Sequence, residues 1–303
     1  MSAYSADYER LLALTETRLA AMLPEIDSRA RTLDDAMRYT LLAPGKRLRP
    51  VLLLLSCEFL GGDAEEALPY ACAIEFIHNY SLIHDDLPAM DDDDLRRGNP
   101  TNHKVFGEGI AVLAGDGLLS SAFECIACDL YNSSGDPGRM RRHACAALQI
   151  AVACGASGMI AGQAADLEAE NREVSAELLD FIHKNKTAAM IRAAVTAGAC
   201  LAGAPEDAIT RMSAFGESLG LAFQIVDDLL DAEGDAAETG KEAGMDAERG
   251  KATWPALHGA EASRERVRAL TAAAEEALTG CPGDDGKRES LLELARSLET
   301  RVK

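Results

Sequence analysis

The sequence predicts an all-α protein, with residues 1–303 folded as a single domain, a bundle of about ten helices. Apolar residues recur at helical spacing almost everywhere, and no run shows the alternation of a half-buried strand. Alanine and leucine are abundant and aromatic residues make up only 5% of the chain, which favours helix over strand. The chain is 48% hydrophobic, enough for a substantial core, and no linker separates two domains.

Glycine, proline and aspartate residues interrupt the helical pattern and set its boundaries. The interruptions fall, in chain order, at Pro44-Gly45, Gly61 to Asp63, Gly98 to Pro100, Ser133 to Pro137, Gly203 to Pro205, and Gly234 to Gly250. The helices predicted between them are residues 4–22, 30–43, 49–60, 64–92, 107–132, 137–168, 175–201, 205–232, 253–280 and 286–301. Pro88 lies inside the fourth predicted helix, where a missing backbone donor should kink the helix and re-aim Asp91.

The charge and the cysteine content exclude several classes of protein. A net charge of −20 argues against nucleic acid and against an anionic membrane surface as partners. The longest apolar run near the start, residues 51–55, is far too short to span a bilayer, so we expect no stable membrane insertion. The first ten residues show no signal peptide pattern, and the cysteines lie mostly in apolar segments. We therefore expect reduced thiols and a cytoplasmic protein.

Two clusters of aspartates are the sequence's main functional signal. The first, residues 85–94, places six aspartates in ten positions directly behind an apolar run. The second, residues 227–231, follows another apolar run, and its first and last aspartates are on one helix face. A single acidic run is commonly a solvated helix end, but carboxylates repel one another and helix C-termini favour cations. Two such runs predict a site for a hard cation, Mg²⁺ or Mn²⁺.

These motifs carry a resemblance to a known family. Asp85-Asp86 with Asp91, followed by Leu95-Arg96-Arg97-Gly98, and the later Asp227-Asp228-Leu229-Leu230-Asp231 resemble the paired motifs of the trans-isoprenyl diphosphate synthases. The bacterial farnesyl diphosphate synthase type is the most similar, because it also carries the two extra residues Pro88 and Ala89 in the first motif. The resemblance covers residues 45–255 and implies helices arranged around a central cavity, with isopentenyl diphosphate and an allylic diphosphate as substrates.

The resemblance also implies a role for each matching residue. Three Mg²⁺ ions would be held by Asp85, Asp91 and Asp227, with Asp86 and Asp231 in supporting roles and Asp228 among the catalytic residues. The allylic diphosphate would be bound by Arg96, Lys186, Lys241 and Lys251. Isopentenyl diphosphate would be bound without metal by Lys46, Arg49, His78 and Arg97, although His78 has the alternative of packing near a helix face. Thr187, Gln224, Gln163 and Asp166 match positions near the reacting allylic cation, or are ordinary polar residues of helices.

Product length is expected to depend on residues one turn before the first cluster. If the diphosphate lies at Asp85, the growing tail runs back along the same helix past Ser81 and Tyr80. Tyr80 is bulky and is expected to form a floor, unless it is simply a core tyrosine. We therefore predict farnesyl diphosphate (C15) as the product, with geranylgeranyl diphosphate (C20) as the alternative.

Two alternatives to a synthase are a terpene cyclase and a non-catalytic partner subunit. A terpene cyclase would lack the complete second motif and the Lys46 and Arg49 pair, whereas a non-catalytic partner subunit would lose acidic ligands from one motif; this chain retains all of them. Residues 234–250 are expected to form a lid that carries Lys241, and Met245 stands where many relatives have a basic residue. The resemblance implies a homodimer.

Overall fold

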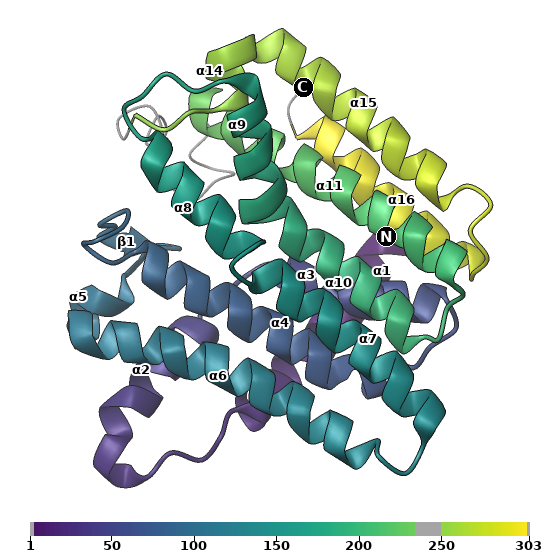
Figure 1. Cartoon of the computed structure of the whole chain (residues 1–303), viewed down its shortest axis with the longest axis horizontal. Helices are drawn as coiled ribbons and strands as arrows, with labels where there is room; N and C mark the ends of the chain where they lie inside the picture. Colours follow the sequence, from purple (N-terminus) through teal and green to yellow (C-terminus); the bar gives the residue numbers. More distant parts are fainter. Residues whose placement is uncertain (1–2, 234–249, 302–303) are drawn as a thin grey trace.

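The computed structural model describes residues 3–233 and 250–301 and confirms the all-α fold. Helices pack along and across one another in a bundle, with the two ends of the chain on the same side (Figure 1). The α-helices are α1 (Ala3–Leu19), α2 (Arg31–Leu41), α3 (Leu48–Phe59), α4 (Ala64–Asp85), α5 (Asn102–Phe106), α6 (Glu108–Asn132), α7 (Pro137–Cys154), α8 (Met159–Ala169), α9 (Ala176–Ile182), α10 (Ala189–Leu201), α11 (Glu206–Glu233), α14 (Trp254–His258), α15 (Ala260–Leu278) and α16 (Asp285–Thr300). Short 3₁₀ turns η1 (Ala20–Met22) and η2 (Ser28–Ala30) flank the first connection, and a π-helical turn, η3 (His183–Ala188), joins α9 to α10.

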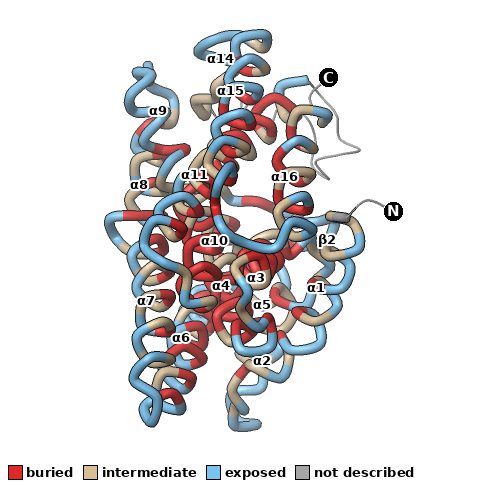
Figure 2. The backbone as a smooth tube through the Cα atoms, turned by 90° about the vertical axis from the view of Figure 1, so that its right-hand side faces the viewer, coloured by how far each residue is buried: buried red, intermediate tan, exposed pale blue. Residues whose placement is uncertain are grey.

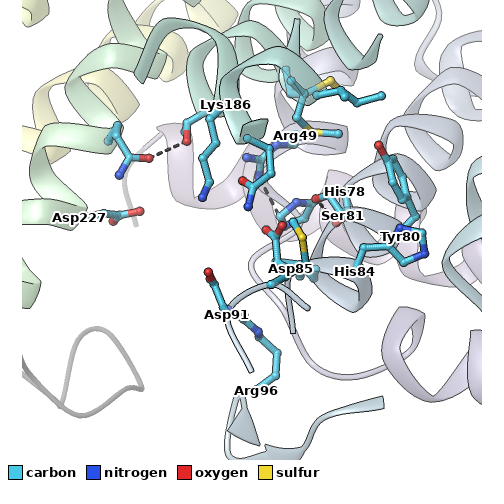
Figure 3. Close-up of a pocket in the computed structure, with 18 of the residues that line it drawn as sticks. Arg49, His78, Tyr80, Ser81, His84, Asp85, Asp91, Arg96, Lys186 and Asp227 are labelled. Atoms are coloured by element: carbon cyan, nitrogen blue, oxygen red, sulfur yellow. Dashed lines mark hydrogen bonds between the residues drawn. The ribbon is translucent and has the colours of Figure 1, made fainter. Parts of the chain in front are cut away.

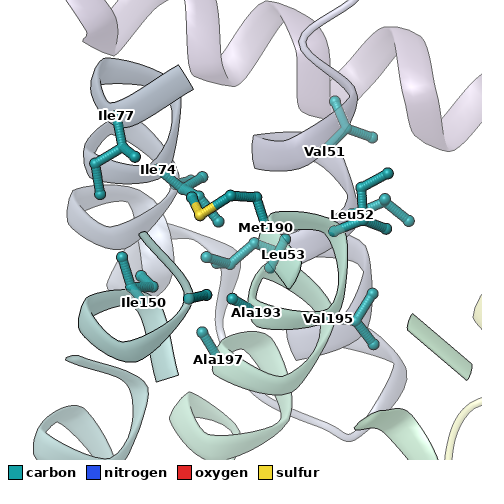
Figure 4. Packing of buried hydrophobic residues seen from close by; sticks show 14 of the residues in the cluster. Val51, Leu52, Leu53, Ile74, Ile77, Ile150, Met190, Ala193, Val195 and Ala197 are labelled. Atoms are coloured by element: carbon teal, nitrogen blue, oxygen red, sulfur yellow. The ribbon is translucent and has the colours of Figure 1, made fainter. Parts of the chain in front are cut away.

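Helix α10 lies at the centre of the core because it is apolar on every side. All of its residues except Arg192 are buried, as expected for a helix without a polar face. Its neighbours α3 and α4 contribute further aliphatic side chains around Met190 (Figure 4). At Gly198, a Cβ atom would lie 2.3 Å from the Leu53 carbonyl oxygen, so only glycine permits this approach of α10 to α3. Buried residues concentrate on α3, α4 and α10 (Figure 2).

The sequence predicts that a helix runs from residue 64 through the first aspartate cluster to residue 92, and this prediction is wrong. The helix ends at Asp85, and residues 86–94 form turns rather than a helix kinked at Pro88. The Asp91 amide donates to the Asp85 carbonyl oxygen at 2.8 Å, which folds the chain back on itself. Asp91 is therefore re-aimed by a tight turn, and a small hairpin of β1 (Leu95–Arg96) and β2 (Asn99–Pro100) follows.

Three other predicted helices are divided. The segment 137–168 breaks between α7 and α8, where a Cβ at Gly158 would meet the Ala153 carbonyl oxygen at 2.2 Å. The segment 175–201 contains the π-helical turn, and 253–280 divides at Gly259, whose φ is 84°. These breaks separate α8, η3 and α14 from their neighbours, and residues of α8 and η3 line the site described next.

Two stretches of the described chain are apolar and long enough to span a membrane: Glu108–Asn132, which is α6, and Pro137–Ala169, which comprises α7 and α8. Only 44% and 33% of their apolar windows are buried. Length and composition alone are weak evidence for a membrane span, because core helices of soluble proteins also satisfy them. Figure 2 shows α6, α7 and α8 along one edge of the molecule.

Candidate active site

Both aspartate clusters line one large cavity. Its volume is about 790 Å³, within the range of small-molecule sites, and it is bounded by the ends of α4 and α11, by α8 and by the π-helical turn. Figure 3 shows Asp227 and Lys186 on one side of the cavity and the first cluster, represented by Asp85 and Asp91, with Arg96 on the other. The lining includes, of the predicted site residues, Lys46, Arg49, His78, Tyr80, Ser81, Asp85, Asp91, Arg96, Gln163, Lys186, Thr187, Gln224, Asp227, Asp228, Asp231 and Lys251.

Asp85 and Asp91 form the acidic wall contributed by the first cluster. Burial raises the pKa of Asp85 to about 6; Lys186 opposes this shift and Asp91 adds to it. Lys251, which is 160 residues further along the chain, donates from Nζ to both carboxylate oxygens of Asp91, at 2.9 and 3.0 Å. The two aspartates are therefore close enough to repel each other, and positive side chains from distant segments offset that repulsion.

The remaining aspartates of the first cluster have different environments. Asp86 and Asp93 are buried and pair with Arg96, whose Nε lies 2.9 Å from Asp86 and whose Nη2 lies 3.0 Å from Asp93. Asp94 is exposed and pairs with Lys104 at 2.7 Å. Burial disfavours the charged Arg96, but the hydrogen bond with Asp86 raises its pKa. Asp86 thus orients a cavity-lining arginine; it does not line this cavity itself.

The π-helical turn brings Lys186 and Thr187 to the opposite wall. Such turns widen a helix locally and recur at functional sites. The turn packs closely on α8 because Gly162 has no side chain; a Cβ there would lie 2.2 Å from the Lys186 amide nitrogen. Lys186 Nζ contacts Asp166 at 2.6 Å; burial disfavours its charged form, but Asp166 and Asp85 raise its pKa. The Lys186 ammonium group thereby reaches the space between the two acidic clusters.

Hydrogen bonds order Thr187 and Gln224 at the cavity wall. Thr187 Oγ1 donates to Gln224 Oε1 at 2.5 Å, and Gln224 Nε2 donates to the buried Asp228 at 2.8 Å. Asp228 also accepts from the Trp254 amide at 3.0 Å and lies 3.4 Å from His183 Nε2. Because the Thr187 proton is given to Gln224, the lone pairs of its hydroxyl oxygen remain available to a cation in the cavity. Asp228 therefore holds Gln224 in place at the cavity wall.

Lys46, Arg49 and His78 gather at another part of the cavity. Arg49 Nη1 lies 3.5 Å from His78 Nε2, and burial together with Arg49 and Arg97 holds the pKa of His78 well below its usual range. A neutral ring beside two basic side chains suits the binding of a phosphate group. His78 lines the cavity beside Arg49, and its role as a ligand stays a prediction.

Arg97, unlike Lys46, Arg49 and His78, does not line the large cavity. It lines a neighbouring cavity of about 390 Å³ rather than the large one. Its Nη1 lies 3.4 Å from the Pro44 carbonyl oxygen, and a Cβ at Gly45 would approach that nitrogen to 2.7 Å. Arg97 therefore rests against the backbone beside Lys46. Lys241, the lid at 234–250 and Met245 lie largely or wholly outside the described residues.

Tyr80 and Ser81 line the part of the cavity that lies one turn before Asp85. The Tyr80 ring is buried and meets the His84 ring edge to face, with 5.5 Å between centroids. Figure 3 shows this pair on the side of the cavity away from Lys186 and Asp227. Ser81 Oγ donates to the His78 carbonyl oxygen at 2.9 Å. The side chains that were expected to meet the substrate tail are thus in the cavity.

The donor set fits a hard divalent cation by chemistry, although no compact metal cage is formed. In residues 3–233 and 250–301, no group of three or more histidine, cysteine, aspartate or glutamate side chains could hold an ion alone. The cavity-lining carboxylates are all oxygen donors, and Asp85 and Asp91 repel each other in the absence of a cation. Oxygen ligands completed by substrate phosphate and water are the usual environment of Mg²⁺.

Sequence reasoning did not identify His183 or Asp93 as parts of this arrangement. His183 follows the apolar Phe181-Ile182 and precedes Lys186 by three residues, so helical spacing would have placed it behind that lysine. Asp93 was visible only as one more member of the first cluster. Its pairing with Arg96 depends on a turn that the sequence pattern did not show.

An all-α bundle with two aspartate clusters and several basic side chains around one cavity is an arrangement suited to an enzyme that binds diphosphate esters. The model of the polyprenyl synthetase family matches residues 30–281, and the chain belongs to that family. It is similar to an Arabidopsis thaliana protein named heterodimeric geranylgeranyl pyrophosphate synthase large subunit 1, chloroplastic, with 47% identity over 89% of this chain and 72% of the relative. Geranylgeranyl pyrophosphate synthase 11 from the same plant is also 47% identical, over 89% of this chain and 75% of its own.

A solved structure supports the same assignment. The FPP/GFPP synthase of Zymomonas mobilis superposes with a TM-score of 0.83 at 34% identity, covering 98% of both chains. Together with the family match, this identifies the chain as a trans-prenyltransferase.

Proposed function

We propose that this enzyme joins isopentenyl diphosphate head to tail to an allylic diphosphate, dimethylallyl or geranyl, and releases a short-chain trans-prenyl diphosphate. The observation that carries the proposal is the meeting of both aspartate clusters and two groups of basic residues in one cavity. Lys186, Arg96 and Lys251 would bind the allylic diphosphate beside Asp85, Asp91 and Asp227. Lys46, Arg49 and His78 would bind the second diphosphate without metal.

The side chains in the cavity support ionisation followed by condensation. Three Mg²⁺ ions, when bound by Asp85, Asp91 and Asp227, would neutralise the diphosphate and make it a better leaving group. The allylic C–O bond breaks, the isopentenyl double bond attacks the resulting cation, and one proton is lost to the released diphosphate. Thr187, held by its hydrogen bond to Gln224, presents oxygen lone pairs to the cation, and the apolar part of the walls excludes water.

For the product we propose geranylgeranyl diphosphate (C20), in preference to the farnesyl diphosphate that the sequence analysis favoured. The two plant relatives support the longer product by their names, whereas the solved structure from Zymomonas mobilis is named an FPP/GFPP synthase. Ser81 is small, and the Tyr80 ring packs against His84 rather than standing alone in the cavity. Farnesyl diphosphate remains the second candidate because Tyr80 is a bulky side chain in the path of the tail.

We also propose that two copies of the chain associate through α6, α7 and α8. These helices expose large apolar side chains along one edge of the molecule, with 38–59% of each residue accessible: Val112, Leu113, Phe123, Leu148, Val152 and Ile160. A second copy would remove this surface from water. Sedimentation equilibrium should give twice the 32.2 kDa mass of one chain. A monomer would contradict the homodimer and favour a different subunit as partner, as in the relative named heterodimeric.

A product assay tests the reaction and the chain length together. The purified protein is incubated with Mg²⁺, dimethylallyl diphosphate and labelled isopentenyl diphosphate, and the products are dephosphorylated and sized by chromatography. Geranylgeraniol would support the full proposal, whereas farnesol as the end product would overturn the C20 assignment and keep the reaction. No condensation with any allylic starter, by folded protein that binds diphosphate, would contradict the reaction.

A further inference from the structure

Arg47 separates the two basic residues that line the homoallylic end of the cavity, yet it does not line the cavity itself. Lys46 precedes it, and Arg49 lies in the first turn of α3, which begins at Leu48. The Arg47 side chain is completely inaccessible to solvent. A fully buried arginine between two cavity-lining cations therefore has a role other than contact with substrate.

The buried guanidinium joins three parts of the chain. Nε donates to Glu16 on α1 at 2.7 Å, and Nη1 donates to Glu75 on α4 at 2.8 Å. Nη2 donates to the carbonyl oxygens of Leu41 and Ala43, at 2.7 and 2.8 Å. A planar guanidinium that donates to several partners in this way holds them in fixed directions. The turn that carries Lys46 is thereby tied to α1, α4 and the end of α2.

The backbone of Arg47 also requires such support. Its φ and ψ are both 40°, the left-handed conformation that residues with a side chain rarely adopt. Conformations of this kind persist where surrounding contacts impose them, and they concentrate at functional sites. A further bond, from the Tyr8 hydroxyl to the Lys46 carbonyl oxygen at 2.7 Å, holds the residue before it. The left-handed turn sends Lys46 and Arg49 toward the cavity and the Arg47 side chain away from it.

Charge gives Arg47 a second effect on the same residues. Glu75 is only 1% exposed, and it interacts electrostatically with Arg49 and Arg97 as well as with Arg47. An uncompensated buried carboxylate is costly, so without Arg47 it would attract the nearest remaining cation. Arg49 would then be drawn toward Glu75 and away from substrate. The Arg47 and Glu75 pair leaves Arg49 available to a phosphate.

We propose that Arg47 is a positioning residue for binding of the homoallylic diphosphate, acting through Lys46 and Arg49 and not by contact with substrate. This inference rests on the proposed function of those two residues. It predicts a selective defect: affinity for isopentenyl diphosphate falls, while binding of the allylic substrate at the aspartate clusters does not change.

The test is calorimetric titration of isopentenyl diphosphate in the absence of Mg²⁺, with Arg47→Lys, Arg47→Gly and Glu16→Gln variants. Lysine keeps the charge but cannot make the same set of bonds, and glycine keeps the left-handed backbone without the anchor. We expect at least a tenfold loss of affinity for both Arg47 variants and about a threefold loss for Glu16→Gln. Arg10→Gln is the matched control, because Arg10 bonds Glu58 between α1 and α3 away from the turn; its affinity should stay within twofold of wild type.

A second titration, of an allylic diphosphate with Mg²⁺, separates positioning from a general structural role. All variants should bind it within threefold of wild type, and the KM for isopentenyl diphosphate should rise with little change in kcat. Wild-type affinity in Arg47→Lys or Arg47→Gly, or equal losses for both substrates, would overturn the inference. If the Arg47 variants do not fold, Glu16→Gln decides, since Glu16 is 39% exposed and its loss should leave the fold intact.

The result for the wild-type protein shows which proposal has failed. If it binds no isopentenyl diphosphate without Mg²⁺, the proposed homoallylic site is wrong and this inference falls with it. If it binds and the variants bind equally well, only the role of Arg47 is wrong.

Discussion

Lys251 donates hydrogen bonds from one ammonium nitrogen to both oxygens of Asp91, at 2.9 and 3.0 Å. The two residues are far apart in the chain: Asp91 lies in the turn after α4, and Lys251 lies in the segment before α14. Asp91 in turn adds to the rise in the pKa of Asp85. A lysine thus carries the positive charge that this carboxylate needs when no divalent ion is bound to it.

The first prediction concerns Lys251→Gln. Without the lysine, Asp91 loses two charge-assisted hydrogen bonds and Asp85 loses one of the cations that offset its burial, so the metal-free protein should lose about 1 kcal/mol or more, which lowers Tm by roughly 2–4 °C. Mg²⁺ should restore more of the Tm in the variant than in wild type, because ligand binding stabilises the folded state in proportion to its affinity. Differential scanning calorimetry with and without Mg²⁺ measures both. Lys104→Gln, which breaks an exposed pair with Asp94, is the control; equal responses in both variants would contradict this role of Lys251.

The second prediction concerns Thr187→Val. Valine keeps the shape but removes the hydroxyl oxygen that faces the cation, so kcat should fall roughly tenfold to a hundredfold with little change in either KM. Steady-state kinetics with both substrates varied provides the measurement. Thr196→Val is matched to it, since Thr196 is buried on α10 and its hydroxyl bonds only locally to the Arg192 carbonyl oxygen in the described structure. A rise in KM without loss of kcat would argue for simple substrate binding.

The third prediction concerns Tyr80→Ala. Removing the ring should open the end of the cavity beyond Ser81 and shift the product to a longer chain than wild type makes, by one or more five-carbon units. Chromatography of the dephosphorylated products measures the shift. Tyr39→Ala, in the neighbouring cavity, should leave the product distribution unchanged. An unaltered product from Tyr80→Ala would show that the tail takes another path.

The fourth prediction is a pH dependence of stability from His183. Burial lowers its pKa to about 4, and its Nδ1 has no hydrogen-bond partner within the described chain. Below the ordinary pKa of about 6.5 the unfolded chain binds a proton that the folded protein does not, so stability falls as pH drops from 6.5 to 4. The contribution lost is roughly 3 kcal/mol. Urea unfolding between pH 4 and 7 measures the free energy of unfolding at each pH. This free energy should change less with pH in His183→Gln than in wild type; an identical pH dependence would contradict the assignment.

The helical class and most of the cavity residues follow from the sequence because their signals are local. Helical spacing of apolar residues marks the core helices, and the charge of the two clusters is incompatible with simple burial. Asp85, Asp227 and Lys186 accordingly line one cavity, as the motifs indicated. Their catalytic roles stay predictions, which the experiments above address.

The remaining features depend on contacts that periodicity does not encode. The turn at 86–94 is set by backbone bonds such as that from Asp91 to Asp85, and it divides the first cluster between the cavity and Arg96. The π-helical turn requires the close approach of Gly162 to Lys186, which is a tertiary contact. Arg97 looked equivalent to Arg96 in sequence, but the hairpin places it against Gly45 and the neighbouring cavity.

The most direct test of the account compares condensation rates for wild type, Asp85→Asn and Asp227→Asn, with Asp94→Asn as the exposed control. Incorporation of labelled isopentenyl diphosphate into an allylic starter is measured at saturating Mg²⁺, after circular dichroism has shown that each variant is folded. If both clusters act on one diphosphate, each of the first two variants should lose at least about a hundredfold in kcat, since each removes charge stabilisation from the leaving group, and Asp94→Asn should stay within about twofold of wild type because its carboxylate is solvated. Near wild-type turnover by Asp85→Asn or Asp227→Asn would contradict the account.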